Sequence, residues 1–115
     1  MHQIHKDRLP DREQLLNIFA SLREREEMLA DGPVACCQSC GHDEMGRMRG
    51  AKHYVFWHDQ SEDAFDDSGY LVGPLYLYHS DTISASRVRR VLEKRGHRVK
   101  WDGEEDRALE VSRSS

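Results

Sequence analysis

The segment Tyr54–Trp57, YVFW, constrains the fold of this chain more than any other stretch of its sequence. Its residues are aromatic or β-branched, which are the residue types that favour extended strands. The segment therefore predicts a strand near the middle of the chain, and any fold considered for the protein must place a sheet there.

The same segment decides how the neighbouring cysteines and histidines are interpreted. Cys37, Cys40, His53 and His58 have the C-x2-C-x12-H-x4-H spacing of a C2H2 zinc finger. Such a finger carries both histidines on one helix. In a strand, residues five positions apart lie on opposite faces and about 16 Å from each other. The predicted strand thus argues against a zinc finger.

Apolar residues recur at helical spacing from Leu15 to Leu29 and predict a first amphipathic helix. Asp11 is its expected N-cap, with Gln14 completing a capping box. The sequence DGP at 31–33 is expected to end it, because glycine favours a helix C-terminus and proline blocks continuation.

A second helix is predicted from Ser84, its expected N-cap, to Arg95. Ile83 and Val88 form the expected hydrophobic staple, and Gly96 ends the helix. Further strands are expected at 75–79 and 97–102, with a short final strand at 107–111.

This order of elements predicts an α+β fold, with an antiparallel or mixed sheet of about four strands packed against two main helices. A chain of 115 residues has the length of one domain. We therefore expect a flexible N-terminal arm at 1–10, a single domain at 11–111 and a disordered tail at 112–115.

The charge of the chain limits its partners and its compartment. Its net charge is −4, which argues against general binding to nucleic acids. No apolar run is long enough to span a membrane, and the N-terminus lacks the hydrophobic stretch of a signal peptide. We expect a cytoplasmic protein, in which the three cysteines stay reduced.

Cys37 and Cys40 form half of a zinc knuckle and need two further ligands to close a tetrahedral site. His58 and His79 each end a predicted strand, so both imidazoles reach one end of the sheet if those strands pair. The zinc interpretation therefore takes Cys37, Cys40, His58 and His79 as ligands, with Cys36 and His42 as substitutes.

Two other interpretations of the cysteines remain open. In the first, Cys37 or Cys40 acts as a nucleophile or a redox pair, with His58 as a general base, and the protein is a thiol-dependent enzyme. In the second, Cys36, Cys37 and Cys40 are small buried residues that pack under the first helix, as free cysteines often do.

Opposite charges are separated along the chain. A basic cluster lies on the predicted second helix and the strand after it, and an acidic run comes after the central strand. Such separation suits docking to another protein or head-to-tail self-association. The candidate partner-binding residues are Arg87, Arg90, Lys94, Asp63 and Asp66.

Four motifs in order, CCQSCG (36–41), YVFWHDQ (54–60), LYLYH (75–79) and VKWDG (99–103), give the chain a family resemblance. From Cys36 to Val111 it resembles a group of small bacterial proteins classed as a domain of unknown function. The resemblance implies a cytosolic bacterial protein and brings no established activity.

These observations favour a non-enzymatic binding or regulatory module that acts through protein contacts, with a structural zinc holding the CxxC loop. The alternative from another class is the thiol-dependent enzyme or redox protein using Cys37 or Cys40 with His58. A third hypothesis is an immunity or inhibitor protein whose acidic loop meets a basic partner.

Overall fold

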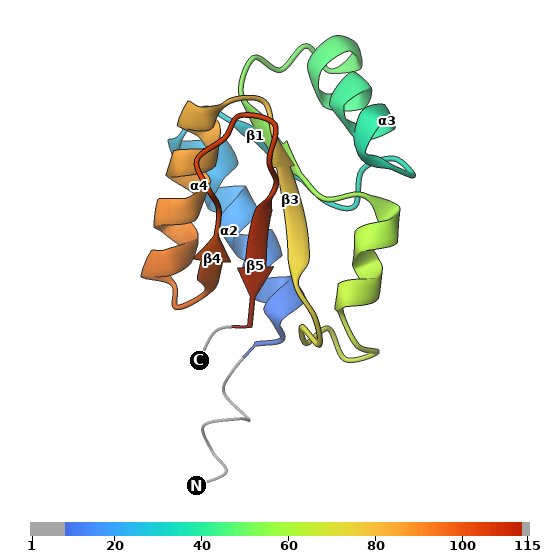
Figure 1. The fold of residues 1–115 in the computed structure, drawn as a ribbon, viewed down its shortest axis with the longest axis vertical. Coiled ribbons are helices and arrows are strands. Elements are labelled where there is room, and N and C mark those ends of the chain that lie inside the picture. The colour runs from blue at the N-terminus through green and yellow to red at the C-terminus, as the bar shows by residue number, and fades with distance from the viewer. Residues whose placement is uncertain (1–8, 114–115) are drawn as a thin grey trace, which may run out of the picture.

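The computed structural model describes residues 9–113, which form helices packed on a five-stranded mixed sheet (Figure 1). The helices are α2 (Asp11–Arg25), α3 (Gln38–His42) and α4 (Thr82–Lys94), with a π-helix η1 (Asp43–Met48) and a 3-10 helix η2 (Asp59–Ala64). The strands are β1 (Leu29–Asp31), β2 (Tyr54–Phe56), β3 (Leu75–His79), β4 (Arg98–Lys100) and β5 (Leu109–Ser112). The predicted α+β class is confirmed, with five strands in place of about four.

The sheet has the strand order β1-β2-β3-β5-β4. β1 runs parallel to β2, and the other neighbouring pairs are antiparallel. β3 is central because it pairs with β2 near His79 and with β5 from Leu75 to Leu77. No helix within residues 9–113 is long and apolar enough to cross a membrane.

The central strand β2 is buried on both of its faces, which explains why YVFW is apolar throughout. Val55 faces the larger hydrophobic cluster, which α2 and α4 cover (Figure 1). Tyr54 and Phe56 face the opposite way, as alternation in a strand requires, and pack with Met45 of η1 in a second cluster. This second cluster is the base on which α3 and η1 rest.

The prediction that the first helix continues to Leu29 is wrong. α2 ends at Arg25, and Glu27 adopts a positive φ of 53° that turns the chain. Leu29 then donates its N–H to the carbonyl of His53 at 3.0 Å and begins β1 beside β2. Pairing with a fully buried strand outweighs the helical spacing of the apolar residues, a tertiary effect that periodicity does not report.

Asp11 is not the N-cap of α2, because Pro10 takes that position and makes no side-chain cap. The Asp11 carboxylate instead accepts the backbone N–H of Leu71 at 2.7 Å. Gln14 donates its side-chain amide to the carbonyl of Leu9, so the expected capping box does not form.

α4 begins two residues earlier than predicted. Asp81 is its N-cap, and the Asp81 carboxylate accepts the backbone N–H of Ser84 at 2.7 Å. Ile83 remains 59% exposed, so it does not form the expected staple with Val88. The end of the helix is as predicted, because Gly96 follows it with φ of 94°.

Most of the expected terminal segments lie outside the described residues, namely 1–8 of the arm and 114–115 of the tail. Ser112 was expected to begin the tail, but it pairs with Arg98 in the sheet. Arg113 lies with its guanidinium 5.6 Å from the centre of the Tyr70 ring. Strand β5 therefore includes one residue beyond the expected domain boundary at 111.

Candidate metal centre

The cysteines lie in a turn that leaves the sheet after β1 and enters α3. The N–H of Val34 donates to the carbonyl of Trp57 at 2.8 Å, and the carbonyl of Ala35 accepts the N–H of Asp59 at 3.0 Å. Ala35 has a positive φ of 61°, which reverses the chain just before the first cysteine. The turn thus starts from an anchored, buried residue and directs the following side chains outward.

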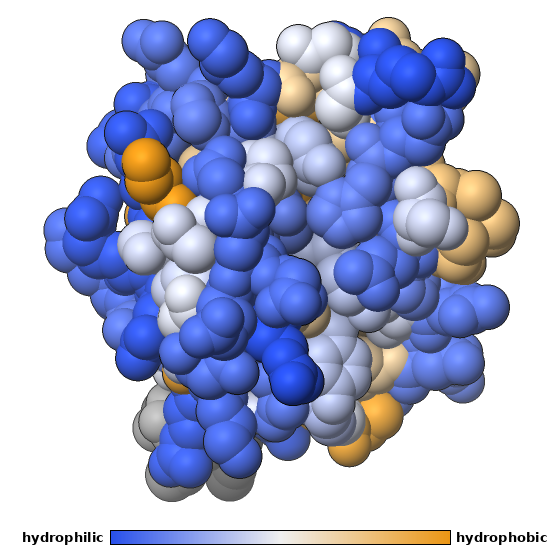
Figure 2. Space-filling view, turned by 45° about the horizontal axis from the view of Figure 1, so that its top comes forward, coloured by the Kyte–Doolittle hydropathy of each residue, from blue (hydrophilic) through white to orange (hydrophobic). Residues whose placement is uncertain are grey.

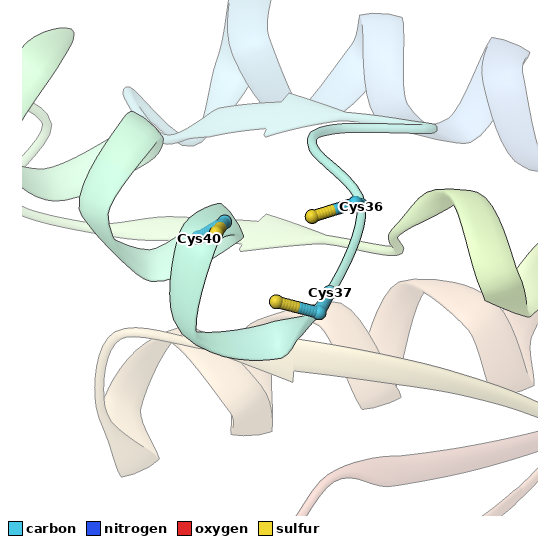
Figure 3. A group of neighbouring side chains, drawn as sticks. All are labelled: Cys36, Cys37 and Cys40. Carbon is cyan, nitrogen blue, oxygen red and sulfur yellow. The ribbon is translucent and has the colours of Figure 1, made fainter.

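Cys36, Cys37 and Cys40 come together at the first turn of α3 (Figure 3). Their sulfur atoms all lie within 4.8 Å of one another, and all three are free thiols. Cys36 and Cys40 are exposed and Cys37 is half-buried. The interpretation that these cysteines are buried under the first helix is therefore wrong, because the turn carries them to the surface beside α3.

Two contacts hold α3 on β2 and so determine where Cys40 lies. Gly41 is buried against the ring of Phe56, closer than any side chain would allow. The Nδ1 atom of His42 forms a hydrogen bond of 2.7 Å with the hydroxyl of Tyr54. These residues use the inner side of the short helix, and Cys40 remains on its exposed side.

Within the cluster, the pKa values of Cys37 and Cys40 are shifted in opposite directions. The backbone N–H of Cys40 and then the hydroxyl of Ser39 donate to the Cys37 sulfur, and they lower the pKa of Cys37 to about 7. The thiol of Cys40 donates to Cys37 in turn, which raises the pKa of Cys40 to about 11. The arrangement therefore stabilises one thiolate near neutral pH even without a metal.

This donor set fits a thiophilic metal ion. Thiolates are preferred ligands of zinc and monovalent copper, and close sulfur atoms can meet one ion after small rotations of their side chains. Among residues 9–113, the three cysteines are the one group of at least three His, Cys, Asp or Glu whose ligand atoms converge in this way. Cys36, considered from sequence as a substitute, is a full member.

His58 and His79 do not join the cysteines, so the predicted ligand set of Cys37, Cys40, His58 and His79 is not assembled. β2 and β3 do pair, but they are antiparallel, with Val55 opposite His79. His58 follows Val55 by three positions, so the pairing separates the two histidines along the ladder. Antiparallel strands end at opposite sides of a sheet, whereas the predicted site required both strands to end at the same side.

Each of these histidines has other neighbours. His58 is buried, stacks on Tyr78 with ring centres 5.3 Å apart, and has Nδ1 3.4 Å from the hydroxyl of Ser61. His79 donates from Nε2 to the carbonyl of Arg107 at 2.8 Å and meets the edge of Trp101. Both imidazoles support the sheet and the loops next to it.

His42 and His53 are also separate from the cysteine group. Burial, and then the charge of His79, lowers the pKa of His42. His53 forms a 2.9 Å contact with the carboxylate of Asp81 at the start of α4. Because β2 is a strand between His53 and His58, the argument against a zinc finger is confirmed.

The catalytic hypothesis paired Cys37 or Cys40 with His58 as a base. In the described part of the chain, the polar and ring neighbours of His58 are Ser61 and Tyr78, and no cysteine is among them. The thiolate of Cys37 is stabilised within its own turn. The arrangement thus lacks the nucleophile–base contact that a cysteine hydrolase uses.

The candidate partner-binding residues differ in how far they are engaged. Arg87 lies 3.9 Å from the carboxylate of Glu26, and Asp66 accepts backbone N–H groups of the 66–70 turn. Arg90, Lys94 and Asp63 are exposed. Asp66 is exposed as well, so Arg87 is the half-buried member of this set.

A cavity of about 460 Å³ adjoins α3 and was not foreseen from sequence. Gln38 and His42 of α3 line one side, and the 104–108 loop lines another. These segments are far apart in the chain, so no local pattern links them. α3 therefore carries Cys40 of the cysteine cluster and also contributes residues to the wall of this cavity.

The chain belongs to a family described as a domain of unknown function, DUF6891, whose match covers residues 6–115. This confirms the resemblance to such a family, and extends it through the first helix. Searches of the curated proteins and of the solved structures found no significant match.

Proposed function

We propose that this protein is a small binding module whose cysteine turn holds a thiophilic metal ion through Cys36, Cys37 and Cys40. The observation that carries the proposal is the approach of the three sulfurs to within 4.8 Å of one another at the surface. Zinc is the first ion to test, because it is bound by cysteine thiolates and is redox-inert.

Metal binding at this place acts on α3. The ion links Cys36 and Cys37, which precede the helix, to Cys40 within it, and thus fixes its first turn. α3 continues directly into η1, and Gly41 and His42 hold it against β2. A helical segment this short has little stability of its own, so the ion adds a restraint at its first turn.

The module acts through contacts with another protein or with a second copy of the chain. The face seen in Figure 2 is mainly hydrophilic, with small and separate hydrophobic areas. Such a surface suits polar, charge-guided docking, for which Arg90, Lys94 and Asp63 are available. We place the protein in the bacterial cytosol, where free thiols persist.

The decisive experiment purifies the full chain with a phosphine reductant and without added metal, loads it with zinc, and then measures the bound zinc. We expect about one zinc ion per chain, and its loss in Cys36→Ser, Cys37→Ser and Cys40→Ser. His58→Gln is the control, because His58 belongs to the ligand set predicted from sequence but lies outside the cysteine group.

Retention of zinc by all three cysteine variants would contradict the proposal, as would the absence of bound metal in the reduced wild-type protein. Loss of zinc in His58→Gln with a retained fold would instead support the ligand set inferred from sequence. Circular dichroism of each variant separates loss of a ligand from loss of the fold.

A second candidate function is a thiol redox protein, supported by the opposite pKa shifts of Cys37 and Cys40. In that case the Cys37 thiolate attacks a disulfide substrate, and Cys40 then displaces the substrate thiol. The protein gains a Cys37–Cys40 disulfide, while the substrate takes up two electrons and two protons. Thiol titration and mass spectrometry after equilibration with a small disulfide test this function.

The two candidates predict different behaviour of Cys36. Redox exchange needs only Cys37 and Cys40, so Cys36→Ser leaves disulfide formation intact. Metal binding uses all three sulfurs, so the same variant loses the ion. A reversible Cys37–Cys40 disulfide together with metal-free reduced protein would favour the redox function.

A further inference from the structure

The cysteine cluster supplies three ligands from one short turn. No fourth His, Cys, Asp or Glu among residues 9–113 joins the group whose ligand atoms lie within 4.8 Å of one another. The histidines nearest in sequence or expected at the strand ends are engaged elsewhere: His42 with Tyr54 and His79 with the carbonyl of Arg107. Within residues 9–113, an ion bound in the cluster therefore receives three ligands, the sulfurs of Cys36, Cys37 and Cys40.

The cluster is also open to solvent. Cys36 and Cys40 are exposed, and the side chains of Cys36 and Cys37 point toward Cys40 (Figure 3). Structural zinc sites are closed, with four protein ligands. This geometry differs in both the number of ligands and the access of solvent.

We propose that the cluster is an open three-thiolate site that prefers monovalent copper to zinc and passes the ion to incoming thiol ligands. The inference rests on the proposed metal binding and names the ion and its exchange. It makes the protein a carrier or sensor of a soft metal, and α3 the element that responds to loading.

The preference follows from what each ion needs. Monovalent copper is soft, favours thiolates and is satisfied by three of them. Zinc in structural sites is tetrahedral and requires a fourth ligand, and no other His, Cys, Asp or Glu among residues 9–113 joins the cluster to supply it. Three sulfurs therefore complete the shell of copper and leave that of zinc incomplete.

Exchange through the open side involves no oxidation. An incoming thiolate forms a bond to the bound ion, one cysteine sulfur leaves, and that sulfur takes up a proton. The copper remains monovalent, and the process repeats until the ion has moved to the acceptor. Exposure of Cys36 and Cys40 gives the incoming ligand its path.

The test titrates the reduced full chain, without oxygen, with monovalent copper and with zinc, each in competition with a chelator of known affinity. X-ray absorption then counts the sulfur ligands. We expect one copper ion per chain with three sulfur ligands, displacement of bound zinc by copper, and release of copper to glutathione within minutes. Each single Cys→Ser variant is expected to lower copper affinity by more than about 100-fold, beyond the effect of outer-shell changes.

Ser39→Cys provides a matched variant. The hydroxyl of Ser39 lies 3.6 Å from the sulfur of Cys37, so the substitution adds a fourth sulfur beside the cluster. We expect this variant to shift the preference toward zinc by about tenfold or more and to slow its release, because the tetrahedral shell is then complete. Ser39→Ala is its reference variant, because it also loses the hydroxyl next to Cys37 but gains no sulfur, and the shift in Ser39→Cys is measured relative to it.

A wild-type protein that holds zinc with four ligands, resists displacement by copper and releases the ion slowly would overturn this inference, while leaving metal binding intact. An unchanged copper-to-zinc preference in folded Ser39→Cys would also overturn it. A reduced protein that binds neither ion would instead refute the proposed function itself.

Discussion

At Cys37, hydrogen bonds within one turn change the chemistry of a single side chain. The lowered pKa of about 7 comes first from the backbone N–H of Cys40 and then from the hydroxyl of Ser39. Because the thiolate is the nucleophile, the reactivity of Cys37 follows this pKa. In metal-free reduced protein, we expect its alkylation by iodoacetamide to reach half its maximal rate at about pH 7.

Mass spectrometry of quenched samples measures this rate for each cysteine separately. Cys40 should react only at higher pH, since its pKa is raised to about 11. Ser39→Ala removes one donor and is expected to move the midpoint of Cys37 upward. A midpoint of about 8.5 in the wild-type protein, the value of an ordinary cysteine, would show that the turn does not stabilise the thiolate.

Asp81 also acts at the scale of one residue. Partial burial opposes its ionisation, but hydrogen bonds from the Ser84 N–H, His53 and Ser80 prevail and hold the pKa of Asp81 far below its usual value. We expect Asp81→Ala to destabilise the protein by about 0.5–2 kcal/mol at neutral pH, as the loss of an N-cap does. Urea denaturation measures the change.

The sign of the pH dependence follows from the lowered pKa of Asp81. The contribution of Asp81 to the free energy of unfolding is fully present above about pH 4, the pKa of an aspartate in the unfolded chain. It declines as the pH falls further and the carboxylate becomes protonated. The difference in unfolding free energy between wild type and Asp81→Ala should therefore shrink below about pH 4. Asp63→Ala is the exposed control, and an equal effect of both variants would contradict the role of the cap.

At the scale of elements, the packing of α3 on β2 holds the helix that carries Cys40 in place. A side chain at Gly41 would overlap the Phe56 ring, whereas one at Gly46 in η1 would lie 3.5 Å from Tyr54, an ordinary contact. We expect Gly41→Ala to destabilise the protein by about 1–3 kcal/mol, as overpacking does. It should also weaken metal binding, although no ligand is changed.

Gly46→Ala is the matched control, since it makes the same substitution in a neighbouring helical segment. It should leave metal affinity unchanged and raise helix stability by at most about 1 kcal/mol. Thermal unfolding with and without metal measures both effects. Equal metal affinity in Gly41→Ala and wild type would mean that the geometry of the cysteine turn does not depend on the packing of Gly41 against Phe56.

β1 shows how an element can contradict its own local pattern. Leu29 continues the apolar spacing of α2, yet it pairs with Tyr54 in the sheet. The chain reverses at Glu27, and Ala30 is completely buried. Periodicity indicates which side chains avoid water, and in this segment a short strand buries Ala30 fully and Leu29 partly.

At the scale of the whole molecule, Asp11 connects segments that are distant in sequence. Its carboxylate accepts the N–H of buried Leu71 and lies 3.9 Å from the Nε2 atom of His97, which follows α4. We expect Asp11→Ala to reduce the free energy of unfolding by about 1–3 kcal/mol, because the amide of Leu71 loses its acceptor in a buried place.

Glu13→Ala, in the same first turn but exposed, is the control and should change stability by less than about 0.5 kcal/mol. Chemical denaturation of both variants gives the comparison. A similar small effect in Asp11→Ala would contradict the structural role of this carboxylate.

The sequence by itself determined the local parts of this protein. YVFW predicted β2, helical spacing predicted most of α2 and α4, and together they predicted the α+β class. The three cysteines identified the turn in which a metal can bind. These inferences succeed because residue types and spacings act over a few neighbouring positions.

Only the tertiary structure decided which candidate ligands meet. The antiparallel pairing of β2 and β3 separates His58 from His79, and the reversal at Ala35 exposes the cysteines that a local argument would bury. Strand direction and the exit of a turn depend on contacts between distant segments. Residue spacing does not encode those contacts, so the sequence predicts His58 and His79 beside Cys37 and Cys40 and gives Cys36 only as a substitute ligand.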